Sequence, residues 1–170
     1  KRNPEGHIIE IRGCSGEVRA EMTAVDREFR LPLQFPKEVL LEADKISDSI
    51  PKEEIKNRLD LRKLICFTID PEDAKDFDDA VSLEQLPDGN FKRGVHIADV
   101  SHYVREGTAL DEESYKRGTS VYLADEVIPM LPEKLSNGIC SLRPKEDRLT
   151  YSTIMTVSSK GVVNDYHIEK

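Results

Sequence analysis

The chain has 170 residues, 38% of them hydrophobic and 34% charged, and its formal net charge is −8 at pH 7. This length allows one ordinary domain or a small domain beside part of another, and the composition excludes general disorder. The acidic balance argues against a broad nucleic-acid surface, because phosphate binding draws on Lys and Arg. It does not exclude an acidic catalytic centre that meets phosphate through metal ions. No apolar run approaches the length of a transmembrane helix and no signal peptide opens the sequence, so no membrane partner is predicted.

The first part of the chain is predicted to be all β. Residues 7–13, 17–25 and 27–34 form short runs of strand-forming residues separated by turn residues. Three closely spaced strands without a helix indicate part of a small β-barrel or a β-meander.

The pattern changes at Pro36. Residues 36–46 carry apolar side chains near helical spacing, and Pro36 suits a first helical turn. Residues 47–63 are highly charged and contain Pro51, which predicts a linker with a short helix. We therefore expect a C-terminal part of a β-domain, a linker and a second domain, at 1–45, 46–62 and 63–170.

The second domain is predicted to mix short helices with hairpins. The elements expected are a buried strand, a hairpin, a helix, a strand followed by irregular chain, a short helix or turn, and a last hairpin, at 64–69, 76–100, 108–118, 119–132, 132–138 and 149–168. The first hairpin turns at PDGN, where Gly89 supplies a positive φ. Thr108 can cap the helix at its start and Gly118 suits its end. Hairpins without regular βαβ units indicate a mixed α+β domain.

The cysteines predict a reducing compartment. Cys14, Cys66 and Cys140 are far apart, odd in number and lack any CxxC pairing. This usage favours free thiols over a disulfide or zinc site. We therefore expect a cytoplasmic protein.

Aspartates crowd the segment that follows the strand at 64–69. Within ten positions the chain places Asp70, Asp73, Asp76, Asp78 and Asp79. Two carboxylates about 5 Å apart repel by about 3 kcal/mol at an effective dielectric near 20, so such a group needs a cation, a shared proton or water. Because side chains alternate along a strand, these acids can converge only where the chain leaves regular strand geometry, such as the start of a strand.

Several interpretations of this cluster are open. Acidic runs are commonly solvated turns, but here the acids are interleaved with core-type residues, namely Phe77, Ala80, Val81 and Leu83. An EF-hand does not fit, because Lys75 or Val81 stands where that loop needs Gly. A DxD motif of the glycosyltransferase type, Asp76-Phe77-Asp78, remains possible. The spacing supports a site for a hard divalent cation and names no reaction.

The chain resembles the ribonuclease II/ribonuclease R family, in which these acids have a place. The resemblance to the start of its catalytic domain, the RNB domain, rests on TIDPEDAKDFDDAVSL, VHIADVSHYV, RGTSVYL and VIPMLPEKLSNGICSLRP, with support from LDLRKL and MTVSSKG. The opening GHIIEIRG resembles the end of the family's second cold-shock domain. The motifs occur in the family's order, cover essentially the whole chain, and are closer to the ribonuclease R branch.

The resemblance implies a fold and an activity. The fold would be mixed α+β, with the tail of a cold-shock, OB-like β-barrel followed by the N-terminal part of an RNB catalytic domain. The activity would be that of a processive 3′→5′ exoribonuclease that hydrolyses single-stranded RNA to nucleoside 5′-monophosphates. The cofactor would be Mg²⁺, for which Mn²⁺ can substitute. No obligate protein partner is evident.

The resemblance also assigns the acids. Asp70, Asp76, Asp78 and Asp79 match the family's four catalytic-site aspartates. Asp78 would be the acid most essential to chemistry, Asp70 and Asp79 would bind Mg²⁺, and Asp76 would support the metal site. Asp73 has no counterpart role.

Further residues are candidates for RNA contacts. Tyr122 matches the family's aromatic clamp at the 3′ end of the substrate, where stacking accepts any base. Asn137 and Arg143 could contact phosphate or ribose, with a structural turn and a surface position as the respective alternatives. His96 and His102 are predicted to be structural, because oxygen-rich Mg²⁺ sites seldom use His.

The family's catalytic domain continues well beyond the last motif of this sequence, and much of its basic RNA surface lies there. We therefore expect the 170-residue chain to be a fragment that is inactive alone. Two other classes of function remain as alternatives: a non-catalytic RNA-binding module of the same fold, and a DxD-type metal-dependent transferase or phosphatase.

Overall fold

The computed structural model describes residues 6–11, 13–14, 16–123 and 126–170. Parts of two predictions, the first strand at 7–13 and the stretch at 119–132, lie outside these described residues, as do positions 1–5 of the predicted β-domain. Within the described residues, no helix has the length and apolar character needed to cross a bilayer.

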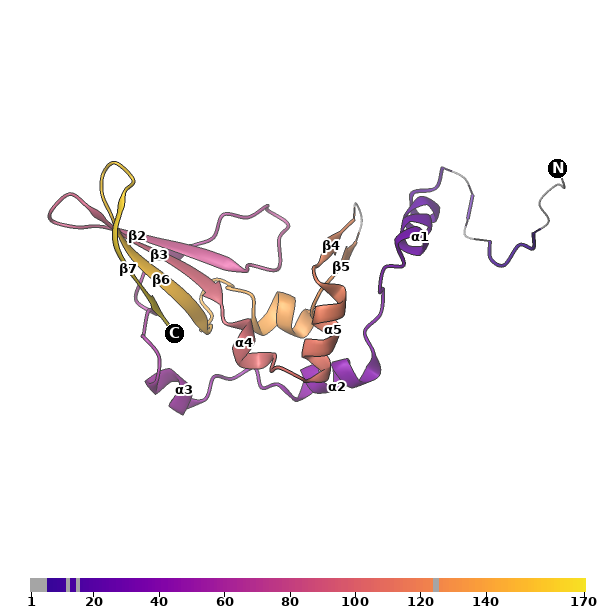
Figure 1. Ribbon diagram of the computed structural model, residues 1–170, viewed down its shortest axis with the longest axis horizontal. Coiled ribbons are helices and arrows are strands. Elements are labelled where there is room, and N and C mark those ends of the chain that lie inside the picture. Colours follow the sequence, from indigo (N-terminus) through magenta and orange to yellow (C-terminus); the bar gives the residue numbers. More distant parts are fainter. Residues whose placement is uncertain (1–5, 12, 15, 124–125) are drawn as a thin grey trace.

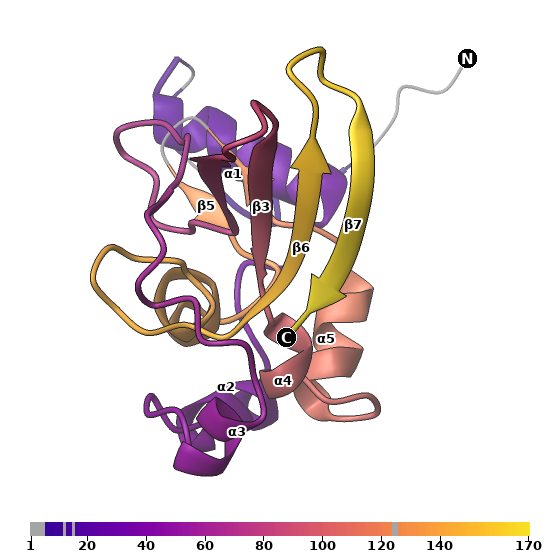
Figure 2. The same ribbon diagram turned by 90° about the vertical axis from the view of Figure 1, so that its left-hand side faces the viewer.

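An antiparallel five-stranded sheet forms one end of the molecule (Figures 1 and 2). Its strands, in spatial order, are β1 (Cys66–Phe67), β2 (Asp79–Gln85), β3 (Phe91–Ala98), β6 (Thr150–Val157) and β7 (Val163–Glu169). The PDGN turn joins β2 to β3 as predicted. Gly89 has a φ of +85° there, which a side chain would make costly, and the Asn90 N–H donates to Asp88 Oδ1 at 3.0 Å.

Short helices and a small ribbon complete the fold. They are α1 (Val18–Phe29), α2 (Lys37–Lys45), α3 (Lys52–Lys56), α4 (Val100–Tyr103), α5 (Ala109–Arg117), a π-helical turn η1 (Lys134–Ile139), and the paired strands β4 (Val121–Tyr122) and β5 (Val127–Ile128). A buried apolar cluster joins α2, α5, η1 and the end of β3, through Val39, Ala43, Ala98, Leu110, Leu131, Leu135, Ile139 and Cys140. This core therefore lies beside the sheet rather than between two sheets.

Several elements are confirmed. The helix predicted at 36–46 is α2, the linker contains α3, and the last hairpin is β6–β7. The Thr108 side chain accepts the Asp111 N–H at 3.3 Å, and Gly118 ends α5 with a φ of +72°. These are features that local sequence determines, since capping and turn residues act over a few positions.

The strands predicted before Pro36 are wrong for the described residues. Helix α1 occupies Val18–Phe29, and neither 6–11 nor 30–34 forms a strand. Strand-forming side chains such as Ile8 and Ile9 are 86% and 94% exposed, and no strand among the described residues pairs with their segment. Without such a partner, local helix propensity decides, and Val18–Phe29 contains Ala, Glu, Met and Arg. The cold-shock barrel tail is thus not seen, and the division at 1–45, 46–62 and 63–170 stays a prediction.

The strand predicted at 64–69 is shorter and less buried than expected. Only Cys66 and Phe67 pair with β2, and Ile65 and Ile69 are 84% and 85% exposed. The register places a row of exposed side chains on the same sheet face as Phe67, namely Leu83, Ile97, Tyr151, Tyr166 and Ile168. The prediction of a buried strand over 64–69 is therefore wrong in its length and burial, because the described residues leave that face uncovered.

Candidate active site

The aspartates lie where β1 and β2 meet, at one edge of the sheet. Asp70 follows β1 by three residues, and β2 begins only at Asp79. Asp76 and Asp78 therefore precede the regular strand. The expectation that the acids lie at the start of a strand, outside its alternation, is confirmed for Asp76 and Asp78, whereas Asp79 is already paired with Ile97 of β3.

A buried turn after η1 fixes the backbone of this loop. The Ser141 hydroxyl donates to the Lys75 carbonyl at 2.8 Å and accepts the Phe77 N–H at 3.0 Å. The Leu142 N–H then donates to the Phe77 carbonyl at 2.8 Å, and the Ala98 N–H of β3 donates to the Asp78 carbonyl at 3.0 Å. The loop is held on two sides by neutral hydrogen bonds.

Three of the predicted acids act on the fourth, Asp78. Burial raises the pKa of the Asp78 carboxyl, and the negative charges of Asp76, Asp79 and Asp70 raise it further. Asp73 is not among these influences. The structure therefore brings Asp70, Asp76, Asp78 and Asp79 within electrostatic reach and leaves Asp73 outside the group.

Tyr122 reaches the same group from β4. Its hydroxyl donates to a carboxylate oxygen of Asp76, while the residue remains 62% exposed. That hydrogen bond, together with burial and the charges of Asp76 and Asp78, raises the pKa of Tyr122 to about 12. The phenol is thus anchored at the acids while the side chain stays accessible.

The donor chemistry suits a hard cation. Four carboxylates provide only oxygen ligands, as Mg²⁺ prefers, and a cation would relieve the repulsion that raises the pKa of Asp78. Within the described residues, however, no three acidic, His or Cys side chains are gathered closely enough to hold an ion together. The residues therefore fit Mg²⁺ in kind, and the carboxylates must move closer together to bind it.

Comparison with known proteins identifies the family. The family model described as "RNB domain" matches residues 58–170. The chain belongs to the RNB domain family. Among curated relatives, Ribonuclease R of Thermotoga maritima is 51% identical over 169 residues, and Ribonuclease R of Aquifex aeolicus is 48% identical over 169 residues. The alignments cover 98% and 99% of this chain and 24% of each relative.

A solved structure agrees with the RNB assignment. Mycoplasma genitalium RNase R in complex with ribose-methylated single-stranded RNA superposes with a TM-score of 0.84 at 31% identity, covering 93% of this chain and 24% of that one. The chain therefore spans about a quarter of the length of these relatives.

The two other predicted RNA contacts lie in η1 and shortly after it. Asn137 is half-buried in η1 and accepts a long bond from Ser136 at 3.4 Å. Arg143, two residues after Ser141, is exposed and pairs with Glu146 at 3.8 Å. Among the described residues, no hydrogen bond joins Asn137 or Arg143 to the aspartates, so their RNA roles stay predictions.

The two histidines have other partners. His96 is 3% exposed and its ring nitrogens bond Ser82 and Ser152 at 3.0 and 2.9 Å, which ties β2, β3 and β6 together. Burial lowers the pKa of His96. His102 lies 3.5 Å from Glu54. These contacts agree with the structural roles predicted for both.

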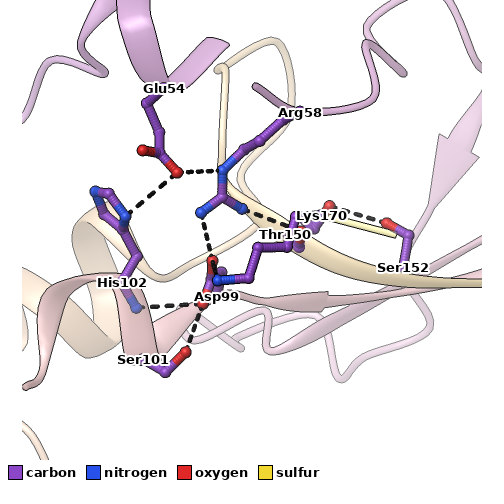
Figure 3. Close-up of polar contacts among 8 residues, drawn as sticks. All are labelled: Glu54, Arg58, Asp99, Ser101, His102, Thr150, Ser152 and Lys170. Carbon is purple, nitrogen blue, oxygen red and sulfur yellow. Dashed lines mark hydrogen bonds and ion pairs between the residues drawn. The ribbon is translucent and has the colours of Figure 1, made fainter. Parts of the chain in front are cut away.

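A charged network at the start of the RNB match was missed in the sequence (Figure 3). The Arg58 guanidinium, 7% exposed, donates to Glu54 and to the fully buried Asp99 at 2.6 Å each, and to the Thr150 carbonyl at 3.4 Å. Burial acts to raise the pKa of Asp99, but hydrogen bonds from Arg58 and Ser101 outweigh it and hold that pKa below its usual range. The network fastens the linker helix α3 to the end of β3. The sequence gives no sign of it, because Arg58 and Asp99 are 41 positions apart.

Proposed function

We propose that the protein carrying this chain is a Mg²⁺-dependent exoribonuclease that degrades single-stranded RNA processively from its 3′ end, by hydrolysis, to nucleoside 5′-monophosphates. The observation that carries the proposal is the group of four mutually repelling carboxylates at the edge of the sheet, in a chain of the RNB domain family. The RNA in the Mycoplasma structure supports the choice of substrate.

The four aspartates would have different roles in binding the metal and in catalysis. Asp70 and Asp79, on either side of the loop, would supply oxygen ligands, and Asp76 would support them while it holds the Tyr122 hydroxyl. Asp78, whose pKa its neighbours raise, would be the acid most sensitive to replacement. When bound, Mg²⁺ neutralises the scissile phosphate and activates water.

Tyr122 would stack on the base at the 3′ end of the RNA. Its side chain is accessible while its hydroxyl is fixed to Asp76, so a terminal base can stack on the ring beside the acids. Stacking is independent of base identity and contributes about 1–3 kcal/mol per base. Asn137 and Arg143 would contact phosphate or ribose from the segment that follows η1.

The proposal also concerns the activity of the isolated chain and the cellular location of the protein. Because the chain spans about a quarter of its relatives, we expect the isolated 170 residues to be inactive. We also place the protein in the cytoplasm, in keeping with three free cysteines.

The decisive experiment uses the natural protein that contains this sequence, as wild type and as Asp78→Asn. Each is incubated with 5′-labelled single-stranded RNA and Mg²⁺, and RNA binding is measured in parallel. The proposal expects stepwise shortening by the wild type, and binding without cleavage by the variant. If both proteins cleave alike, Asp78 is not the catalytic acid. If neither shortens RNA, the proposed activity is wrong.

A further inference from the structure

The Ser141 hydroxyl lies next to the candidate active site, where it both donates and accepts a hydrogen bond. The residue is 0% exposed. Its hydroxyl hydrogen goes to the Lys75 carbonyl and its oxygen receives the Phe77 N–H, at 2.8 and 3.0 Å. These two peptide groups flank Asp76 on either side. One hydroxyl therefore bridges the backbone immediately before and after an acid assigned to the metal site.

The turn that presents Ser141 is itself fixed. The Ser141 N–H donates to the Gly138 carbonyl at 3.0 Å, and the Ser141 carbonyl accepts from the Arg148 guanidinium and from the Arg143 N–H, both at 2.8 Å. Cys140, just before it, belongs to the buried apolar cluster. Because these contacts fix the Ser141 hydroxyl relative to the core, its hydrogen bonds can fix the loop backbone relative to the core as well.

The loop needs such support because repulsion among its carboxylates destabilises the conformation that holds them together. The chain carries Asp70, Asp76, Asp78 and Asp79 within ten positions, and like charges this close repel one another. In the absence of a cation, repulsion favours spreading of the carboxylates. Hydrogen bonds from neutral groups oppose it, namely those to the loop backbone and the one from the Tyr122 hydroxyl to Asp76. Among the described residues, Ser141 supplies two of the three hydrogen bonds that join the loop to the turn after η1, and Leu142 supplies the third.

We infer that Ser141 is a positioning residue for the metal site: its hydroxyl sets the backbone around Asp76 so that the carboxylates can converge on Mg²⁺. The inference rests on the proposed function, which it deepens. Ser141 is 0% exposed and both partners of its hydroxyl are backbone groups, so it would not itself bind the metal or the RNA. It acts through Asp76 and Asp78, in the way that groups behind metal ligands orient them, where loss of one such group typically weakens metal affinity or activity about 10- to 100-fold.

Ser152 provides a matched control. It is also 0% exposed, and its hydroxyl also has two partners, His96 at 2.9 Å and Thr150 at 3.0 Å. It lies in β6, and among the described residues no hydrogen bond joins its hydroxyl to the aspartate loop. Replacing either serine with Ala removes the same atoms from an equally buried place.

The first measurement needs no activity. Amide hydrogen exchange is followed by NMR in the 170-residue chain as wild type, Ser141→Ala and Ser152→Ala. We expect exchange at Phe77 to accelerate at least about 10-fold in Ser141→Ala alone, while Ala98, whose N–H donates to Asp78, keeps its protection. Unchanged exchange at Phe77 in Ser141→Ala would overturn the inference.

The second measurement is metal dependence in the natural protein that contains this sequence. Ser141→Ala should raise the Mg²⁺ concentration for half-maximal cleavage about 10- to 100-fold, and Ser152→Ala should leave it unchanged even if it lowers the melting temperature. Equal Mg²⁺ dependence of the two variants would overturn the inference and leave the proposed nuclease intact. If wild type does not cleave RNA, the proposed function fails, and the exchange experiment still decides whether Ser141 holds the loop. Should Ser141→Ala not fold, Ser141→Cys fills the same site with a weaker hydrogen-bonding group and serves in both experiments.

Discussion

Replacing Arg58 with Met tests whether the linker helix is fastened to the sheet by a buried charge network. The substitution leaves Asp99 fully buried with the Ser101 hydroxyl at 2.8 Å, the His102 N–H at 3.2 Å and the Lys170 ammonium at 4.0 Å. Removing one partner of a buried ion pair costs about 3–5 kcal/mol. The partners that remain favour the lower end, about 3 kcal/mol. For a chain of this length, that corresponds to a fall in melting temperature of about 6–12 °C.

The pH dependence makes the test specific. In the wild type, the pKa of Asp99 lies below its usual range, so its contribution to stability is present above the unfolded pKa of about 3.9 and is lost as pH falls through the folded pKa. In Arg58→Met the strongest hydrogen bond is gone, and burial then raises the pKa of Asp99. The variant carboxyl takes up its proton in mild acid, so the stability difference from wild type should shrink between pH 7 and pH 4.5.

The assay is urea denaturation followed by far-UV circular dichroism at both pH values. Arg62→Met is the matched control, because Arg62 pairs with Asp60 on the surface and both side chains are 53% exposed. Surface pairs add little to stability, so this variant should denature close to wild type at either pH. A loss in Arg58→Met no larger than in the control, or one that is constant from pH 7 to pH 4.5, would refute the argument.

Two further predictions concern His96 and Tyr122. Because burial lowers the pKa of His96, the unfolded chain binds a proton first as pH falls below about 6.5. The free energy of unfolding of the wild type, measured by urea denaturation, should therefore fall from pH 7.5 to pH 5.5. His96→Gln should lose much of this pH dependence. An unchanged pH dependence in the variant would contradict the lowered pKa of His96. Tyr122→Phe should retain RNA trimming by the natural protein, since the ring remains, whereas Tyr122→Ala should raise KM for short single-stranded RNA by about 10- to 100-fold. Equal effects of the two substitutions would show that the Asp76 contact matters rather than stacking.

Local features could be predicted from the sequence, because their causes lie within a few residues. Asp88, Gly89 and Asn90 determine the β2–β3 turn, and Thr108 and Gly118 determine the ends of α5. The strands before Pro36 were wrong because a strand depends on a neighbour that local residues do not specify. No strand of the described sheet pairs with this part of the chain, and Val18–Phe29 forms a helix instead.

The candidate site was predictable only in part for the same reason. The four aspartates could be chosen by spacing and resemblance, and the structure brings them within reach of one another. Ser141 could not, because it contacts the loop across 64 and 66 positions. A buried serine in a turn looks like any other in sequence. Its proposed role depends on the two hydrogen-bond partners of its hydroxyl, which are the Lys75 carbonyl and the Phe77 N–H.

The charges around the loop explain why a cation is the simplest partner for it. Burial and three carboxylates determine the pKa of Asp78, and within the described residues no basic side chain acts in the opposite direction. The nearby arginines have other acids as partners: Arg58 has Glu54 and Asp99, and both Arg143 and Arg148 have Glu146. Neutral hydrogen bonds hold the loop in place but cannot compensate its charge. The proposed Mg²⁺ would supply this compensation, since a hard divalent cation takes carboxylate oxygens as ligands.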